Sequence, residues 1–209
     1  MYLFTRQVLV NPAHVRAGMR QAIEMAQYVN QHTNLEVSLF QLLQGAPLGT
    51  LTFAYRTDSY AATFAETDAL LQSDEYMGRV ESGAQYYVGS PQDHVARFIH
   101  QSGEIVGPPA AAGLITASMQ VDKAADAVKW SIELSDFMAK LTGVPNAVLT
   151  SNYGRWGQIA WLTYGSSLAQ LEDAEAQVNS DSGFLKRLGK SEHLFVPGSG
   201  AGSLSRKIA

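Results

Sequence analysis

The sequence predicts an α+β protein built from two similar halves, each with the element order β-α-β-β-α-β. Residues 49–57 read GTLTFAYRT and residues 157–165 read GQIAWLTYG, so nearly the same strand pattern recurs 108 positions further along the chain. A stretch with helical apolar spacing precedes each of these strands, and an acidic one follows each. Apolar residues make up 46% of the 209 residues, which is enough to bury a substantial core.

The first half opens with a strand followed by a helix. Residues 1–10 (MYLFTRQVLV) are rich in apolar side chains, and Asn11 with Pro12 is typical of a helix N-cap and first helical position. The helix carries an apolar stripe at spacings of three and four: Val15, Met19, Ile23 and Ala26. Two strands are expected next, at residues 35–43 and 50–55.

The second half repeats this order. Residues 113–121 (GLITASMQV) form the expected strand, and Asp122 is expected to cap the helix that follows. Its apolar stripe comprises Ala127, Trp130, Leu134, Phe137 and Leu141. Gly143 is a typical helix stop, and strands are expected at residues 146–153 and 158–163.

A second helical region follows in each half. Residues 58–72 and 165–179 are acidic and moderately amphipathic. Ser73 and Ser180 are each followed by Asp and are interpreted as N-caps of a short additional helix. Each half is therefore expected to have a broken second helix before its final strand.

A final strand is expected to close each half, at residues 84–90 and 192–199. Residues 101–113 (QSGEIVGPPAAAG) contain two prolines and three glycines, which predicts an irregular linker. The predicted organisation is a first repeat, a linker and a second repeat, at residues 1–100, 101–113 and 114–209. Residues 198–202 (GSGAG) predict a flexible Gly/Ser tail, although residues 204–209 (LSRKIA) weakly echo residues 95–100 (VARFIH).

Side-chain alternation predicts that each sheet keeps one apolar face under its helices and one mixed face. The apolar face comprises Phe4, Val8, Val10, Leu51 and Phe53 in the first half, and Ile115, Met119, Val121, Ile159 and Trp161 in the second. Arg6 interrupts this face and is expected either to reach solvent or to pair with an acid such as Glu24. The two mixed faces are expected to pack together into one barrel-like core.

This pattern resembles the dimeric α+β barrel superfamily, which includes antibiotic-biosynthesis-monooxygenase-like and NIPSNAP-like proteins and haem-binding chlorite dismutases. The resemblance rests on element order and duplication over residues 1–100 and 114–209. It implies two tandem β-α-β-β-α-β ferredoxin-like repeats that form a dimeric α+β barrel. No catalytic motif carries the resemblance, so it implies a fold rather than a reaction.

Six residues are candidates for a substrate site. Cofactor-free monooxygenase-like relatives hold substrates with Trp, Asn and Tyr side chains, which by resemblance points to Asn152, Tyr153, Trp156 and Tyr164. Arg56 ends a strand on the predicted inner face, where a guanidinium holds a carboxylate or phenolate well; a surface ion pair is the competing interpretation.

His193 is the sixth candidate. Chlorite-dismutase-like relatives use a histidine of the C-terminal unit as haem ligand, whereas the competing interpretation is a histidine satisfied by hydrogen bonds. Trp130 and Trp161 are interpreted as core residues, because they stand where the first half has Met19 and Phe53.

The composition argues against several kinds of site and classes of protein. The chain has no cysteine, which excludes disulfides and thiolate metal sites, and no clustered His and carboxylate spacing predicts a metal site. A net charge of −4 without a basic stripe argues against nucleic acid. The sequence has no apolar run long enough to predict a membrane span, and a cytoplasmic protein is expected. The low charged fraction, 16%, favours wide interfaces and a homo-oligomer.

Three functions are compatible with these features. The first is binding of a small apolar or aromatic molecule, with cofactor-independent monooxygenase-like or isomerase-like activity. The second is a non-catalytic oligomeric assembly protein. The third is haem binding through His193. No cofactor is expected for the first two.

Overall fold

The computed structural model describes the whole chain except residues 152 and 155. The chain divides into two compact units, the first made of residues 1–95 and 207–209 and the second of residues 96–206. Strands and helices alternate in the order β-α-β-β-α-α-β in both, as the sequence predicts, with the second helical region split in two. An origin of the two units by tandem duplication stays a prediction.

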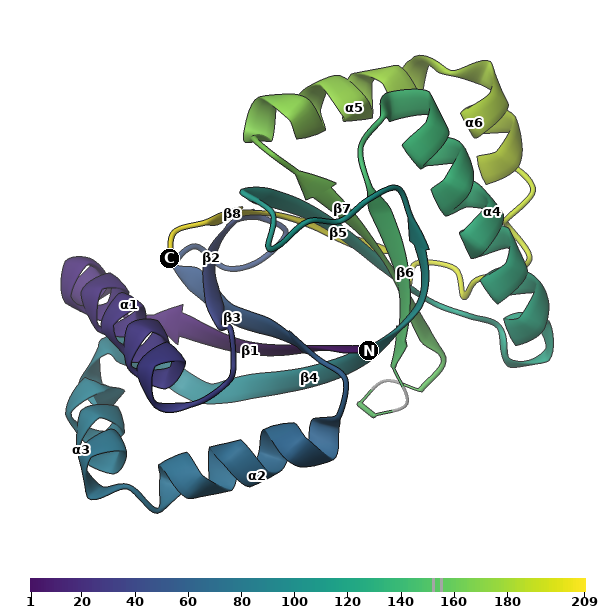
Figure 1. Ribbon diagram of the computed structural model, residues 1–209. Helices are drawn as coiled ribbons and strands as arrows, with labels where there is room; N and C mark the ends of the chain where they lie inside the picture. The colour runs from purple at the N-terminus through teal and green to yellow at the C-terminus, as the bar shows by residue number, and fades with distance from the viewer. Residues whose placement is uncertain (152, 155) are drawn as a thin grey trace. The chain divides into compact units, whose positions relative to one another are not determined.

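In the first unit, helices lie along one side of a set of antiparallel strands (Figure 1). Strand β3 pairs with β1 on one side and with β2 on the other. The elements are β1 (Tyr2–Val10), α1 (Val15–His32), β2 (Ser38–Gln44), β3 (Thr50–Thr57), α2 (Tyr60–Leu71), α3 (Asp74–Gly83) and β4 (Tyr87–Ser102).

The second unit has the same element order. Strand β5 pairs with β7 and with β8, and β6 pairs with β7 and with residues Arg97–Ser102 of β4. Its elements are β5 (Ala111–Ser118), α4 (Ala124–Thr142), β6 (Asn146–Ser151), β7 (Gln158–Gly165), α5 (Leu168–Ser180), α6 (Ser182–Leu188) and β8 (Ala201–Lys207).

Hydrogen bonds connect the eight strands in a closed barrel order, β1-β3-β2-β8-β5-β7-β6-β4. The class is therefore α+β with an antiparallel eight-stranded barrel, as the sequence analysis predicts. The way in which the two units pack against one another stays a prediction. Strand β4 has 16 residues instead of the expected seven, and its residues from Arg97 onward pair with β6 of the second unit.

Two segments differ from the predicted final strands. Residues 84–86 form a short 3₁₀ turn before β4, and residues 192–194 lie in a turn rather than a strand. Phe195 makes only an isolated bridge with Met119, because Pro197 lacks an N–H and Gly198 turns the chain with φ +73°. The predicted flexible tail instead forms β8, which pairs with β5 from Ala111↔Arg206 to Thr116↔Ala201.

Helix caps are partly as predicted. The Asn11 side chain caps the 3₁₀ turn Pro12–His14 that precedes α1, and Ser73 caps α3 by accepting from the Tyr76 N–H. Gly143 ends α4 in the left-handed conformation, φ +70°. The prediction for Ser180 is wrong, because it lies in the last turn of α5 and Asp181 caps α6 instead.

Asp122 does not cap α4. It lies inside a 3₁₀ turn, Val121–Lys123, and the residue before α4 makes no side-chain cap. This turn also removes Val121 from the strand and leaves it 70% exposed. Ile115 is exposed as well, whereas Ala117 and Met119 join the apolar cluster on the helix side of β5 and β7.

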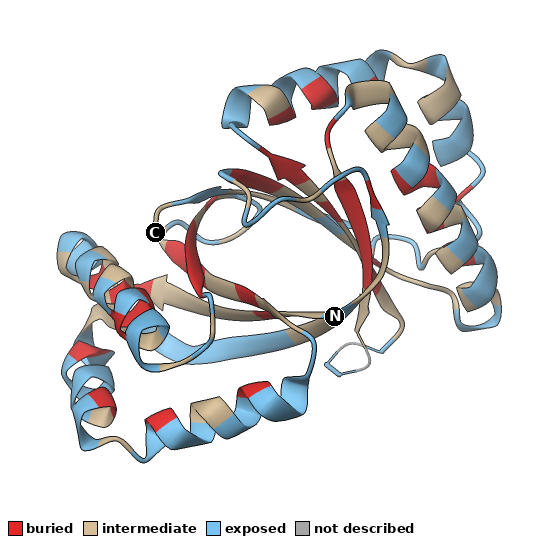
Figure 2. Ribbon diagram, in the orientation of Figure 1, coloured by how far each residue is buried: buried red, intermediate tan, exposed pale blue. Residues whose placement is uncertain are grey.

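Burial follows the predicted faces of the other strands. In the first unit, Phe4, Leu51 and Tyr55 are buried with Ala22 and Ala26 of α1, and the sheet side of α1 is buried along its length (Figure 2). In the second unit, Ile159 and Val148 are buried with partly buried Trp161. The apolar faces of β1, β3 and β7 therefore lie under helices, as side-chain alternation predicts.

Candidate functional site

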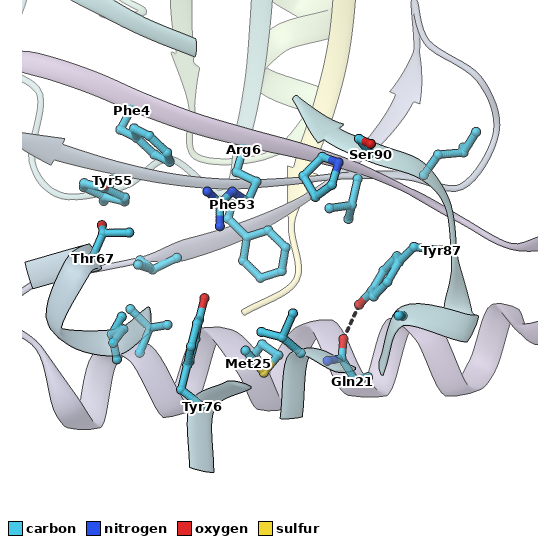
Figure 3. A pocket seen from close by; sticks show the side chains of 18 of the residues that line it. Phe4, Arg6, Gln21, Met25, Phe53, Tyr55, Thr67, Tyr76, Tyr87 and Ser90 are labelled. Atoms are coloured by element: carbon cyan, nitrogen blue, oxygen red, sulfur yellow. Dashed lines mark hydrogen bonds between the residues drawn. The ribbon is translucent and has the colours of Figure 1, made fainter. Parts of the chain in front are cut away.

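A cavity of about 280 Å³ lies in the first unit between the sheet and helices α1–α3 (Figure 3). This volume is near the lower end of the range for small-molecule sites. The wall is mainly aliphatic and aromatic. Its residues from β1 to β3 and α1 are Phe4, Arg6, Val8, Leu9, Gln21, Met25, Val29, Leu35, Val37, Phe53 and Tyr55; those from α2 to β4 are Thr67, Leu70, Tyr76, Val80, Ala84, Tyr87, Val88, Gly89, Ser90 and Pro91.

Larger aromatic side chains occupy the corresponding space in the second unit. Trp130 of α4, Trp161 of β7 and Phe195 meet edge to face, with ring centroids 5.5 to 6.1 Å apart. Trp161 stands where the first unit has Phe53, a residue of the cavity wall. The second unit thus has two indoles where the first unit has the smaller side chains of Met19 and Phe53.

Arg6 provides the charged group of the cavity. Its Nε and Nη2 atoms donate to Oδ1 and Oδ2 of Asp93 on β4, each at 2.7 Å, which is a bidentate ion pair. The Arg6 side chain is 35% exposed and that of Asp93 is 41% exposed, so the pair lies at the margin between the apolar cavity and solvent. The hydrogen bond from Arg6 to Asp93 raises the pKa of the guanidinium, which stays charged.

Aromatic side chains surround the guanidinium. Arg6 extends from β1 toward α1 and α3, with Tyr55 and Phe53 beside it and the hydroxyl end of Tyr76 facing the same space (Figure 3). The Tyr55 ring stacks on Phe4 with centroids 4.8 Å apart. Polar hydrogens of Arg6 and Tyr76 therefore face a cavity whose other walls are mostly apolar.

Tyr87 fixes the opposite end of the cavity. Its hydroxyl hydrogen-bonds to Oε1 of Gln21 and lies 3.2 Å from the Gly18 carbonyl oxygen (Figure 3). Gln21 also donates to the Arg79 carbonyl oxygen at 3.3 Å, so this network joins α1, α3 and β4. Burial raises the pKa of both Tyr55 and Tyr87 to about 12, and both phenols are neutral at physiological pH.

We expect Tyr55 and Tyr87 to titrate near pH 12 in an absorbance titration at 295 nm, above the ordinary value of about 10 for a solvated tyrosine. Because folding raises these two pKa values, their contribution to stability is complete below pH 10. It is lost as the pH rises from about 10 to about 12. Tyr55→Phe should remove one of the late steps. Loss of the Tyr55 and Tyr87 protons near pH 10 in a protein that stays folded would contradict the burial of both phenols.

None of the described residues predicted for the site lines this cavity. Arg56 is half-buried on the opposite face of β3, and Tyr164 is buried at the end of β7 in the second unit. Tyr153 and Trp156 are 67% and 70% exposed in the β6–β7 loop. Asn152 lies outside the described residues. The role of the described candidates in ligand binding stays a prediction.

His193 also lies elsewhere. It is exposed in the turn at residues 192–194, not on the strand that the sequence predicts. Trp130 and Trp161 pack in the aromatic cluster of the second unit, in agreement with their interpretation as core residues. The sequence signal that does point to the cavity is Arg6, a charge on an otherwise apolar face, but its partner is Asp93 and not Glu24.

A second polar cluster lies in the second unit. His100 Nε2 and Ser102 Oγ both lie 2.7 Å from Oδ1 of Asp136, and Ser102 Oγ is 2.9 Å from Ser135 Oγ. Hydrogen bonds from His100 and Ser102 lower the pKa of Asp136. Ser102 contacts the carboxylate rather than the imidazole, so this arrangement is not that of a serine nucleophile activated by histidine.

The described residues form neither a metal-binding cluster nor a membrane-spanning helix. No three His, Asp or Glu side chains come together there as a metal site would require. Nor does any helix in the described residues have the length and hydropathy of a membrane span.

No family model and no curated protein matches this sequence. Solved structures match it over nearly its whole length. A candidate monooxygenase from Fusobacterium nucleatum subsp. nucleatum has a TM-score of 0.73 at 7% identity, covering 100% of this chain and 92% of that one. An anthrone oxidase-like protein has a TM-score of 0.64 at 11% identity, covering 100% and 91%.

A mutant chlorite dismutase from Candidatus Nitrospira defluvii also matches, with a TM-score of 0.57 at 10% identity, covering 100% of this chain and 92% of that one. These structures belong to the dimeric α+β barrel superfamily. The chain therefore has the α+β barrel fold of candidate monooxygenases and their structural neighbours. Identities this low establish the fold alone.

Proposed function

We propose that the protein binds a small, planar, mainly apolar molecule in the cavity of the first unit. The observation that carries this proposal is a 280 Å³ space lined by aliphatic and aromatic side chains, with one guanidinium and a few hydroxyls at its edges. Apolar walls with few, well-placed polar groups are typical of small-molecule sites. The matching space in the second unit is occupied by Trp130, Trp161 and Phe195.

We further propose cofactor-independent oxygenase-like chemistry on the bound molecule. Support comes from the likeness to a candidate monooxygenase and to an anthrone oxidase-like protein. In such a reaction an activated methylene becomes a carbonyl: two C–H bonds are lost, one oxygen atom of O₂ enters the product and the other leaves as water. Oxygen consumption with an aromatic ketone that carries such a methylene tests this step.

Filling the cavity tests binding itself. Val80 lines the cavity from α3 and is 38% exposed, so Val80→Trp places an indole at the wall without opening the core. We expect the Kd for an apolar probe such as 1-ethylnaphthalene to rise at least about tenfold, because the indole occupies the volume that the probe needs. Isothermal titration calorimetry measures this change.

Val121→Trp is the matched control, since Val121 is 70% exposed in the second unit and does not line the cavity. Its Kd should stay within about twofold of wild type. Equal binding by Val80→Trp and wild type would place the ligand elsewhere. Absence of binding to wild type itself would remove the proposed function.

The remaining expectations are kept as proposals: a homo-oligomer, a cytoplasmic location and no nucleic-acid partner. A non-catalytic assembly role is the alternative if wild type binds no small molecule. The haem alternative gains no support from geometry, because His193 is exposed in a turn and does not line the cavity.

A further inference from the structure

We infer that Asp93 determines which ligands the cavity accepts: by neutralising Arg6, it favours an uncharged molecule with one hydrogen-bond acceptor and disfavours a carboxylate. This inference rests on the proposed binding function. It names Asp93 as a specificity-determining residue that acts on the ligand through Arg6.

The charge arrangement is the first step of the argument. Arg6 is the one charged side chain among the residues found to line the cavity. Its charge is already matched by both oxygens of Asp93 at 2.7 Å. The pair is neutral as a unit, so the described cavity wall carries no net charge toward a ligand.

The consequence for an anion follows from desolvation. A carboxylate that enters a mainly apolar cavity loses hydration, and this cost is recovered only by a cation that is not already paired. Here the second carboxylate would share the guanidinium with Asp93 and repel it at short range. The cavity therefore penalises an anion although an arginine lines it.

An uncharged ligand with one hydrogen-bond acceptor avoids this desolvation penalty. The pair with Asp93 uses Nε and Nη2 of Arg6, and Nη1 has no partner among the residues that the structure describes. The Tyr76 hydroxyl faces the same space (Figure 3). A carbonyl oxygen accepts a hydrogen bond from Nη1 at a much smaller desolvation cost than a carboxylate, while its apolar body contacts Phe53 and Met25.

The test compares three naphthalenes of similar size at pH 8 by isothermal titration calorimetry. 1-Ethylnaphthalene has no acceptor, 1-acetylnaphthalene has a neutral acceptor, and 1-naphthoate is an anion. Wild type should bind 1-acetylnaphthalene at least about tenfold more tightly than 1-naphthoate. In Asp93→Asn the amide oxygen still accepts from Arg6 but the negative charge is gone, so the affinity for 1-naphthoate should rise at least about tenfold. Binding of 1-acetylnaphthalene should change by less than about threefold.

Two further variants separate this effect from general causes. Asp126→Asn removes an exposed carboxylate from α4 in the second unit and should leave all three affinities unchanged. Arg6→Met keeps an unbranched side chain but removes the N–H donors. The affinity of this variant for 1-acetylnaphthalene should fall to its affinity for 1-ethylnaphthalene. Thermal melts confirm that each variant is folded.

The outcomes distinguish the two proposals. If 1-ethylnaphthalene binds wild type but Asp93→Asn gains no affinity for 1-naphthoate, the inference on Asp93 is wrong and the binding function stands. If wild type binds 1-acetylnaphthalene and 1-naphthoate with equal affinity, the inference on Asp93 is also wrong and the binding function still stands. If none of the three naphthalenes binds wild type, the binding function fails and the inference fails with it.

Discussion

Replacing Trp161 with alanine is expected to lower the free energy of unfolding by about 3 kcal/mol. The indole packs edge to face against Trp130 and Phe195 and extends the cluster formed by Ala117, Val148 and Ile159. Removal of the ring leaves a space that the antiparallel strands β5–β7 and helix α4 cannot close. Chemical denaturation followed by far-UV circular dichroism measures the change, because the variant alters the tryptophan fluorescence itself.

Trp156→Ala is the matched control. Trp156 is 70% exposed in the β6–β7 loop, and its loss should change the free energy of unfolding by less than about 0.5 kcal/mol. Similar effects of the two substitutions would mean that Trp161 is not a core residue. The helix-side assignment of its strand face would then be wrong as well.

Deletion of residues 201–209 is expected to destabilise the protein by at least about 3 kcal/mol. The deletion removes Leu204, which packs on the cluster of Ala111, Val144 and Leu171. It also removes Ile208, which packs on the core of the first unit, and burial of one such side chain contributes about 1.5–3 kcal/mol. The backbone of β5 loses its pairing with β8, and Leu39 loses hydrogen bonds to residues 208 and 209.

The thermal unfolding temperature of the truncated chain checks this expectation. Gly200→Ser is the control, because a Cβ at this position meets no atom within 4 Å and the residue precedes β8. Its unfolding temperature should match that of wild type. A truncated chain as stable as wild type would show that the tail is dispensable, as the flexible-tail prediction from GSGAG implies.

The candidate cavity shows a limit of prediction from sequence, because none of the described candidate residues lines it. The six candidates were chosen for residue type and resemblance, and the described ones lie on loops, on the opposite sheet face or in the second unit. Arg6 and Asp93 are 87 positions apart, and no local pattern pairs them. Whether a space between sheet and helices is open depends on the volumes of side chains such as Phe53 and Trp161, and packing decides this.

The β4 and β8 strands show the same limit in the fold. Their residues are polar or rich in glycine and carry no strong strand signal, so residues 91–102 and 201–207 form strands because neighbouring strands offer unpaired backbone groups. In the weak echo between residues 95–100 and 204–209, residues 95–100 lie in β4 and residues 204–207 lie in β8, with Arg97 and Arg206 on these strands.

The sequence by itself determined the α+β class, the order of elements in each half and the buried faces of β1, β3 and β7. These follow from local periodicity and capping, which act over a few residues. Only the tertiary structure decided the closed strand order, the cavity in the first unit and the pairing of Arg6 with Asp93. Hydrogen bonds between distant strands and the fit of side-chain volumes arise once remote segments meet, and no short stretch of sequence records them.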